Sequence, residues 1–230
     1  MDEQRIILVL MNFTILLFSL CLHEFGHAAM ADHLGDPTPR MLGRLTLNPM
    51  AHADPIGTIL FPLLRLIFPG SFFFGWAKPV PITPENFKNP RKDGALVAFA
   101  GPLANLSLCL VALGAFALLD LTQIFQPGSS AEYSFVLFFN TFFWINFALA
   151  VFNLIPIFPL DGSWILKAFL PGPWAYKLSQ VDRYGAVILL GALFMFRNVF
   201  NYIFDPVVSG LFLGLHLVGL DHLAQYINLG

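Results

Sequence analysis

The chain is poor in charged residues and cysteine, and it has no excess of basic residues. Charged residues make up only 11% of its 230 residues, against roughly 25% in an average soluble domain. Its two cysteines lie in apolar segments, which excludes a fold held together by disulfides. The formal net charge of −2 leaves no basic face for a nucleic acid, so we expect no nucleic-acid partner.

Apolar residues take the place of the missing charges. Hydrophobic residues make up 57% of the chain, and 26 of them are phenylalanine. This is more apolar surface than a soluble domain of this size can bury, so the composition indicates a protein embedded in a lipid bilayer. A transmembrane helix needs about 20 apolar residues. The candidate segments are residues 6–31, 94–119, 133–160, 184–204 and, more weakly, 206–220.

A further apolar segment, residues 55–77, is interrupted by Arg65, Pro62 and Pro69. We expect it to re-enter the membrane rather than cross it, because irregular backbone is tolerated there when protein or a wet cavity surrounds it. The predicted fold is an all-α polytopic membrane protein with about five to six transmembrane helices and a short β or re-entrant segment after the first. Basic residues gather before residue 94 and after residue 160, which predicts that both regions are cytoplasmic. Met1 is then expected outside, because the segments 6–31 and 133–160 must run in the same direction if His23 and Asp161, near their C-terminal ends, are to meet.

Residues 23–27, His-Glu-Phe-Gly-His, fit the pattern His-Glu-x-x-His, which on a helix is typical of zinc sites. At about 100° per residue, His23 and His27 lie about 40° apart and one turn apart, so both imidazoles can bind one ion. Glu24 points about 100° away from His23, which suits a base acting on metal-bound water. A chance match is disfavoured because a charge deep in the membrane costs roughly 2.5–3.5 kcal/mol.

Asp161 is the candidate for a third metal ligand. A catalytic zinc usually has three protein ligands and one open position. Asp161 follows 28 uncharged residues, and Pro156 and Pro159 remove backbone donors just before it. Asp161 could instead cap a helix that starts at Gly162, but the histidine motif favours the ligand interpretation.

Several separate motifs occur in an order that resembles the site-2 protease family of intramembrane zinc metalloproteases. They are residues 23–27, 43–49 with His52, 54–55 and 57–58, 75–81, 101–105 and 153–162. The resemblance covers about residues 15–165 and is to the minimal branch, without PDZ or CBS domains. It implies that His23, His27 and Asp161 bind one zinc ion per chain and that Glu24 is the base. Asn105 and Asn153 match polar positions that the family keeps near the site.

The resemblance implies an endopeptidase that cuts single-span membrane proteins within the bilayer, in regulated intramembrane proteolysis, by means of a zinc-bound water activated by Glu24. Asn153 or Asn105 could hydrogen-bond the developing oxyanion, although asparagine in a span commonly bonds between helices. We expect one membrane-embedded domain over residues 1–230, with a catalytic core of about 1–165 and additional helices at about 184–227. A prokaryotic plasma membrane is the expected location, and the oligomeric state is not predicted.

Residues 44–48 alternate between polar and apolar, which is the period of a strand. A short strand there could pair with an unwound substrate, which makes Arg44, Leu45, Thr46, Leu47 and Asn105 candidates for substrate binding. An ordinary surface hairpin is the alternative. His52 with Asp54 could form a pair next to the metal ligands or a loop contact. Two other functions stay open at this point: a membrane metal-ion transporter and a noncatalytic protein that binds membrane helices.

Overall fold

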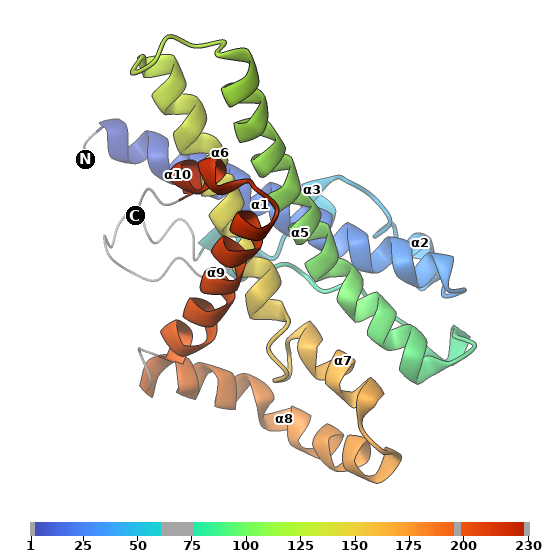
Figure 1. Ribbon diagram of the computed structural model, residues 1–230. Helices are drawn as coiled ribbons and strands as arrows, with labels where there is room; N and C mark the ends of the chain where they lie inside the picture. The colour runs from blue at the N-terminus through green and yellow to red at the C-terminus, as the bar shows by residue number, and fades with distance from the viewer. Residues whose placement is uncertain (1–2, 61–75, 196–198, 228–230) are drawn as a thin grey trace. The chain divides into compact units, whose positions relative to one another are not determined.

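The computed structural model describes residues 3–60, 76–195 and 199–227, and these form helices joined by turns (Figure 1). No strand occurs among the described residues, so the all-α prediction is confirmed. The chain divides into two compact units, Met1–Ser107 and Leu108–Gly230. Helix α5 (Pro90–Thr122) contributes to both units.

The first unit is organised around α1 (Glu3–His33), a helix of 31 residues that contacts both α2 (Thr38–Met41) and α3 (Pro49–His52). After His33 the chain turns at Gly35, whose φ of +105° suits a residue without a side chain. There the Asp36 N–H donates to the Ala31 carbonyl oxygen at 2.9 Å, and the Gly35 N–H donates to that of Asp32 at 3.2 Å. These two bonds satisfy carbonyl groups that the end of the helix would otherwise leave without a partner.

The remaining short elements of the first unit are the π-helical turn η1 (Pro55–Leu60) and the 3-10 turn η2 (Pro84–Asn86). Most of the segment expected to re-enter the membrane, residues 61–75, lies outside the described residues, so that expectation stays a prediction.

The predicted strand at residues 44–48 is wrong, because residues 45–47 form a bend and no strand occurs there. Local hydrogen bonds explain the difference: Thr46 Oγ1 accepts from the Asn48 N–H at 3.2 Å, and Asn48 Oδ1 accepts from the Met50 N–H at 3.1 Å. The second of these bonds caps α3. Polar side chains thus bind the main-chain groups that a strand would offer to a partner.

The second unit contains α6 (Ser130–Asn153), α7 (Asp161–Phe169), α8 (Gly172–Met195), α9 (Val199–Leu217), η3 (Asp221–Leu223) and α10 (Ala224–Ile227). Two expected boundaries are corrected. The helix expected to reach residue 160 ends at Asn153, because Pro156 and Pro159 have no main-chain N–H with which to continue the helical hydrogen bonds. The helix expected from residue 206 begins at Val199 and contains Pro206, because no helix-breaking residue precedes that proline.

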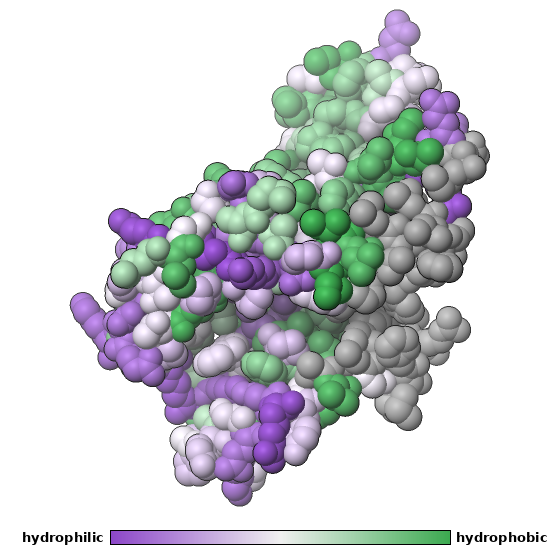
Figure 2. Space-filling view, turned by 180° about the vertical axis from the view of Figure 1, so that it is seen from behind, coloured by the Kyte–Doolittle hydropathy of each residue, from purple (hydrophilic) through white to green (hydrophobic). Residues whose placement is uncertain are grey.

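Three of the described helices are long and apolar enough to cross a membrane: α1, α5 and α6. They fit an integral membrane protein, and the expected total of five to six spans stays a prediction. Figure 2 shows hydrophobic side chains over the hairpin of α5 and α6 and more hydrophilic ones where α7 meets α8.

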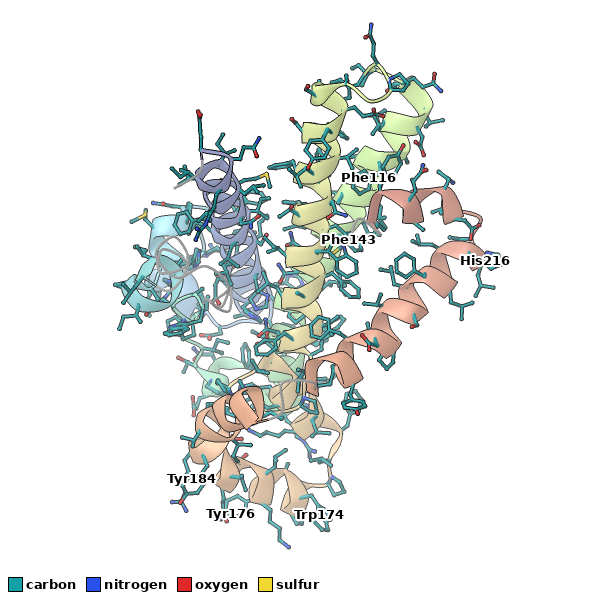
Figure 3. All side chains as sticks on the ribbon, turned by 90° about the vertical axis from the view of Figure 1, so that its left-hand side faces the viewer. Phe116, Phe143, Trp174, Tyr176, Tyr184 and His216 are labelled. Carbon is teal, nitrogen blue, oxygen red and sulfur yellow. The ribbon has the colours of Figure 1, made fainter. Side chains whose placement is uncertain are left out.

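The core of the second unit is aromatic. Phe116 of α5 and Phe143 of α6 are both fully buried (Figure 3). The Phe116 ring stacks on Tyr226 of α10 with ring centroids 5.0 Å apart. Asn140 and Trp144 of α6 donate to main-chain carbonyl oxygens at the end of α10. Aromatic packing and these bonds together fix the C-terminal turns against α5 and α6.

Helix α8 exposes Trp174, Tyr176 and Tyr184 (Figure 3). Lys177 lies 4.9 Å from the Trp174 ring centroid, and Arg183 lies 4.7 Å from that of Tyr184. Exposed tryptophan and tyrosine together with basic residues are typical of a membrane–water interface.

Candidate metal centre

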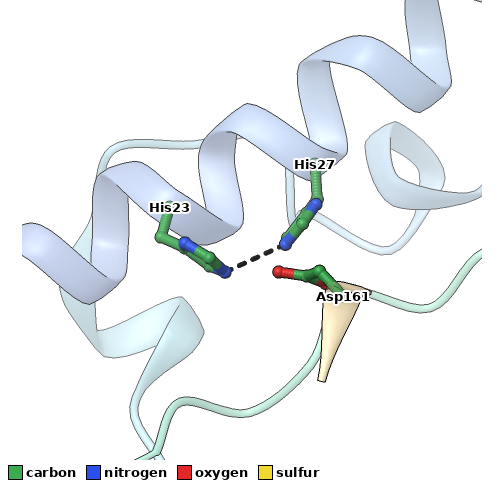
Figure 4. A group of neighbouring side chains, drawn as sticks. All are labelled: His23, His27 and Asp161. Atoms are coloured by element: carbon green, nitrogen blue, oxygen red, sulfur yellow. Dashed lines mark hydrogen bonds between the residues drawn. The ribbon is translucent and has the colours of Figure 1, made fainter. Parts of the chain in front are cut away.

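Two imidazole rings form the centre of the site in the first unit. His23 and His27 lie on consecutive turns of α1, and the two residues are 5% and 7% exposed. The rings are nearly perpendicular, with centroids 4.6 Å apart. Their Nε2 atoms lie 3.0 Å from each other (Figure 4). The spacing of four residues therefore brings one nitrogen of each ring to the same point.

Hydrogen bonds at the other ring nitrogens fix both tautomers. His27 Nδ1 lies 2.7 Å from the carbonyl oxygen of Val97, which can only accept, so Nδ1 carries the proton. His23 Nδ1 lies 2.6 Å from Asn105 Oδ1, while Asn105 Nδ2 donates to the Ser19 carbonyl oxygen at 3.3 Å. The amide is thereby oriented so that His23 Nδ1 is also a donor.

These tautomers fit a metal ion. In a neutral imidazole that carries its proton on Nδ1, Nε2 presents a lone pair. Two such lone pairs 3.0 Å apart repel each other unless a cation lies against them. Metal-bound histidines commonly donate their second N–H to a carbonyl or side-chain oxygen in this way. The donor set is therefore chemically suited to zinc.

Two glycines let α1 and α5 approach closely at this site. A Cβ atom on Gly26 would lie 2.7 Å from the Ala100 carbonyl oxygen, a main-chain atom that cannot move aside. A Cβ atom on Gly101 would overlap the His27 ring at Nε2. Any larger residue at either position would separate the helices or displace the imidazole.

Glu24 is buried next to the histidines, and the residue is 8% exposed. Its Oε2 atom accepts a hydrogen bond from the Val80 N–H at 3.0 Å. The carboxylate is therefore oriented by the main chain of a segment without helix or strand, residues 76–83, that is distant in sequence.

The candidate substrate-binding residues 44–47 differ from one another in exposure. Leu47 is 59% exposed, and its carbonyl oxygen accepts from Cys21 Sγ. Arg44 is only 6% exposed and donates to the carbonyl oxygens of Lys78 and Pro79. An exposed hydrophobic side chain can contact a partner, whereas a buried guanidinium bound to main chain cannot without moving.

His52 and Asp54 have separate partners among the described residues. His52 is buried, and its Nε2 atom lies 2.9 Å from the Thr46 carbonyl oxygen. Asp54 Oδ1 accepts from the main-chain N–H groups of Ile56 and Gly57, at the start of η1. His52 is thus a loop contact, and Asp54 caps a turn.

In the second unit, Asp161 is the first residue of α7, and Leu160 rather than Asp161 occupies the N-cap position. Gly162 packs so closely that a Cβ atom there would overlap the Leu154 carbonyl oxygen. Asn153 ends α6, and its Nδ2 atom donates to the Leu149 carbonyl oxygen in the same helix at 2.9 Å. The asparagine side chain therefore bonds within its own helix through this donor.

Sequence reasoning missed the main-chain groups that orient the site, namely the Val97 and Ser19 carbonyl groups and the Val80 N–H group. Every residue except proline offers the same main-chain groups. No residue type marks which of them will face a ring or a carboxylate, so the sequence carries no signal for these contacts.

The comparisons with known proteins agree with this chemistry. The sequence model that defines peptidase family M50 matches residues 118–196 of this chain. The Bacillus subtilis protein "Putative zinc metalloprotease YwhC" is 39% identical over 196 residues, which cover 84% of each chain. Rip2 of Mycolicibacterium smegmatis, which carries the same designation, is 32% identical over 76% of this chain and 62% of its own length.

A third relative, MJ0611 of Methanocaldococcus jannaschii, is 35% identical over 52% of this chain and 54% of its own length. No solved structure matches the chain significantly. The extent of the similarity to YwhC sets aside the transporter and the noncatalytic alternatives. The chain belongs to peptidase family M50, the site-2 protease family, and is a zinc metalloprotease.

Proposed function

We propose that the protein is an intramembrane endopeptidase that hydrolyses peptide bonds of single-span membrane proteins. The observation that carries the proposal is the pair of imidazoles, buried and held in the metal-binding tautomer, on a helix long enough to cross a membrane. A hydrolytic site on such a helix acts where soluble substrates do not reach. We propose that this cleavage of membrane-spanning substrates serves regulated intramembrane proteolysis.

The proposed ligand set is His23, His27 and Asp161, with one zinc ion per chain. A carboxylate is a common third ligand beside two histidines in catalytic zinc sites, and this set leaves one position open. Asp161 suits the role because it begins α7, and only uncharged residues separate it from the end of α6 at Asn153. When bound, zinc supplies Lewis-acid chemistry, lowering the pKa of water and polarising a carbonyl group.

Glu24 is the proposed general base. Its carboxylate takes a proton from the attacking water and later gives it to the leaving amine. The Val80 N–H binds Oε2, and a carboxylate has further acceptor sites with which to receive the proton. Burial protects the group from bulk water, so the proton stays within the site.

The two asparagines receive different roles. Both ends of the Asn105 amide are engaged, one with His23 and the other with Ser19, so Asn105 orients a ligand instead of contacting substrate. Asn153 is proposed to bind the oxyanion, exchanging its bond to Leu149 for one to substrate. Among residues 44–47, exposed Leu47 is the proposed substrate contact, with Leu45 and Thr46 beside it in the bend.

The proposed location is a multi-pass position in a prokaryotic plasma membrane. Three apolar helices support the membrane location, and bacterial and archaeal relatives support a prokaryotic source.

Zinc content and cleavage measured on the same variants test the function. The purified full chain should contain about one zinc ion and cut a reconstituted single-span substrate. Glu24→Gln should keep zinc and lose cleavage, whereas Asp161→Ala should lose both. Asp205→Ala, which removes an exposed carboxylate of α9, is the control and should change neither. Cleavage that survives in Glu24→Gln would overturn the proposal.

A further inference from the structure

Arg44 is a buried cation whose charge faces main-chain carbonyl groups. The residue is 6% exposed. Nη1 donates to the Pro79 carbonyl oxygen at 3.2 Å, and Nη2 donates to that of Lys78 at 2.5 Å. No carboxylate of the described residues forms a salt bridge with it. A buried guanidinium is costly unless it is hydrogen-bonded, so these two carbonyl bonds are what keep it in place.

The buried His52 contacts the guanidinium group of Arg44. His52 Nε2 lies 2.9 Å from the Thr46 carbonyl oxygen, which requires a proton on Nε2 and leaves Nδ1 as an acceptor. That Nδ1 atom lies 3.4 Å from Arg44 Nη2. The His52 carbonyl oxygen also accepts from the Lys78 N–H at 2.8 Å. Arg44 next to the bend and His52 in α3 therefore hold Lys78 through its carbonyl group and its N–H, respectively.

The two carbonyl groups that Arg44 binds immediately precede Val80. Proline on both sides, at positions 79 and 81, makes Val80 the sole main-chain donor between Lys78 and Ile82. Pro81 also favours an extended conformation for Val80. This one N–H reaches Glu24 Oε2 at 3.0 Å. The carboxylate is thus connected to Arg44 through a short and stiff piece of main chain.

We propose that Arg44 is a positioning residue for Glu24, acting through the Val80 N–H. The proposal rests on the proposed function, because it assigns Arg44 a part in the task of the general base. A catalytic group must be held within about 0.5 Å of its productive position. By fixing the carbonyl groups of Lys78 and Pro79, Arg44 directs the Val80 donor and with it the carboxylate. Arg44 itself does not contact substrate.

Steady-state cleavage kinetics separate positioning from substrate binding. In Arg44→Ala we expect kcat to fall about 10- to 100-fold, as for other residues that orient groups of a metal site, with KM and zinc content unchanged. Arg44→Lys should recover part of kcat, because an ammonium group can reach one carbonyl but does not span two. Arg40→Ala, an exposed arginine paired with Asp32, is the matched control and should behave as wild type.

A second variant removes the same contact without touching Arg44. Val80→Pro deletes the N–H while keeping an extended chain, and it should lower kcat as much as Arg44→Ala does. Val80→Ala keeps the N–H and should lower kcat less. Because both changes act on one contact, the double variant Arg44→Ala/Val80→Pro should be no slower than the slower single variant.

Hydrogen exchange of the Val80 amide tests the contact without any measurement of cleavage. In zinc-free protein the Val80 amide should exchange faster in Arg44→Ala than in wild type or Arg40→Ala. An unchanged kcat in Arg44→Ala or Val80→Pro, a rise in KM alone, or additive effects in the double variant would overturn the proposal. Failure of wild-type cleavage would instead count against the proposed function, and hydrogen exchange would still test the link from Arg44 to Val80.

Discussion

Asn105 on α5 accepts a hydrogen bond from the Nδ1 atom of His23 on α1 at 2.6 Å. The same asparagine donates to the Ser19 carbonyl oxygen, one turn earlier on α1. One buried amide therefore bridges the helix that carries the histidines and sets the tautomer of one of them. Helix α5 is therefore part of the candidate metal site although it supplies no proposed ligand of its own.

Replacing Asn105 should weaken zinc binding. In Asn105→Leu, the His23 ring loses its acceptor and is free to rotate or to change tautomer, so zinc affinity should fall about 10- to 100-fold. Competition with a chromophoric chelator measures this. Ser107→Ala, which alters an exposed residue of the same helix, should bind zinc as wild type does. Equal affinities in the two variants would show that Asn105 does not orient His23.

Two glycines of α5 should respond oppositely to alanine. Gly101→Ala places a methyl group against the His27 ring, so zinc content should fall at least about ten-fold. Gly114→Ala meets nothing within 4 Å and should raise stability by up to about 1 kcal/mol, because alanine favours a helix. Zinc analysis and thermal unfolding of both variants check this. A zinc content equal to that of wild type in Gly101→Ala would contradict the close contact between Gly101 and the His27 ring.

Asp36 should make stability depend on acid pH. This buried carboxylate follows α1, and burial alone would raise its pKa. Hydrogen bonds from Thr38, Thr83 and Asn86 outweigh burial and lower the pKa below its ordinary 3.8. The stabilisation is complete above that value and is lost as the pH falls through the lowered pKa.

Asp36→Asn should therefore lose about 1–3 kcal/mol at neutral pH and show less of the acid-induced decline. Thermal unfolding across the acid range measures both effects. Parallel curves for wild type and Asp36→Asn would show that the hydrogen-bonded charge of Asp36 does not contribute.

Lys167 of α7 and Asp182 of α8 form an ion pair with 9% and 20% of their side chains exposed. The Lys167 ammonium group also lies 5.0 Å from the Trp164 ring centroid. Lys167→Met alone leaves the mostly buried Asp182 carboxylate without its cation and should destabilise the protein by about 3 kcal/mol. Adding Asp182→Leu should restore part of this loss in chemical denaturation. A double variant less stable than Lys167→Met would exclude this account.

Local patterns predicted the features that depend on a single helix. Uninterrupted apolar residues predicted α1, α5 and α6, and the four-residue spacing of His23 and His27 placed both rings on one face. The strand expected at residues 44–48 failed because alternation of polar and apolar residues does not reveal that Thr46 and Asn48 bind nearby main chain. Arg44 was a candidate for substrate binding from the same pattern, and its burial depends on carbonyl groups more than thirty residues away.

By itself, the sequence determined the all-α membrane class and the residue types of the zinc chemistry, because hydropathy and helical period are properties of neighbouring residues. Only the tertiary structure decided the tautomers of the two histidines and the partner of Glu24. Those depend on which main-chain carbonyl and N–H groups approach a side chain. Every residue except proline carries both groups, so only the packing of distant segments selects Val97 and Val80 for these contacts.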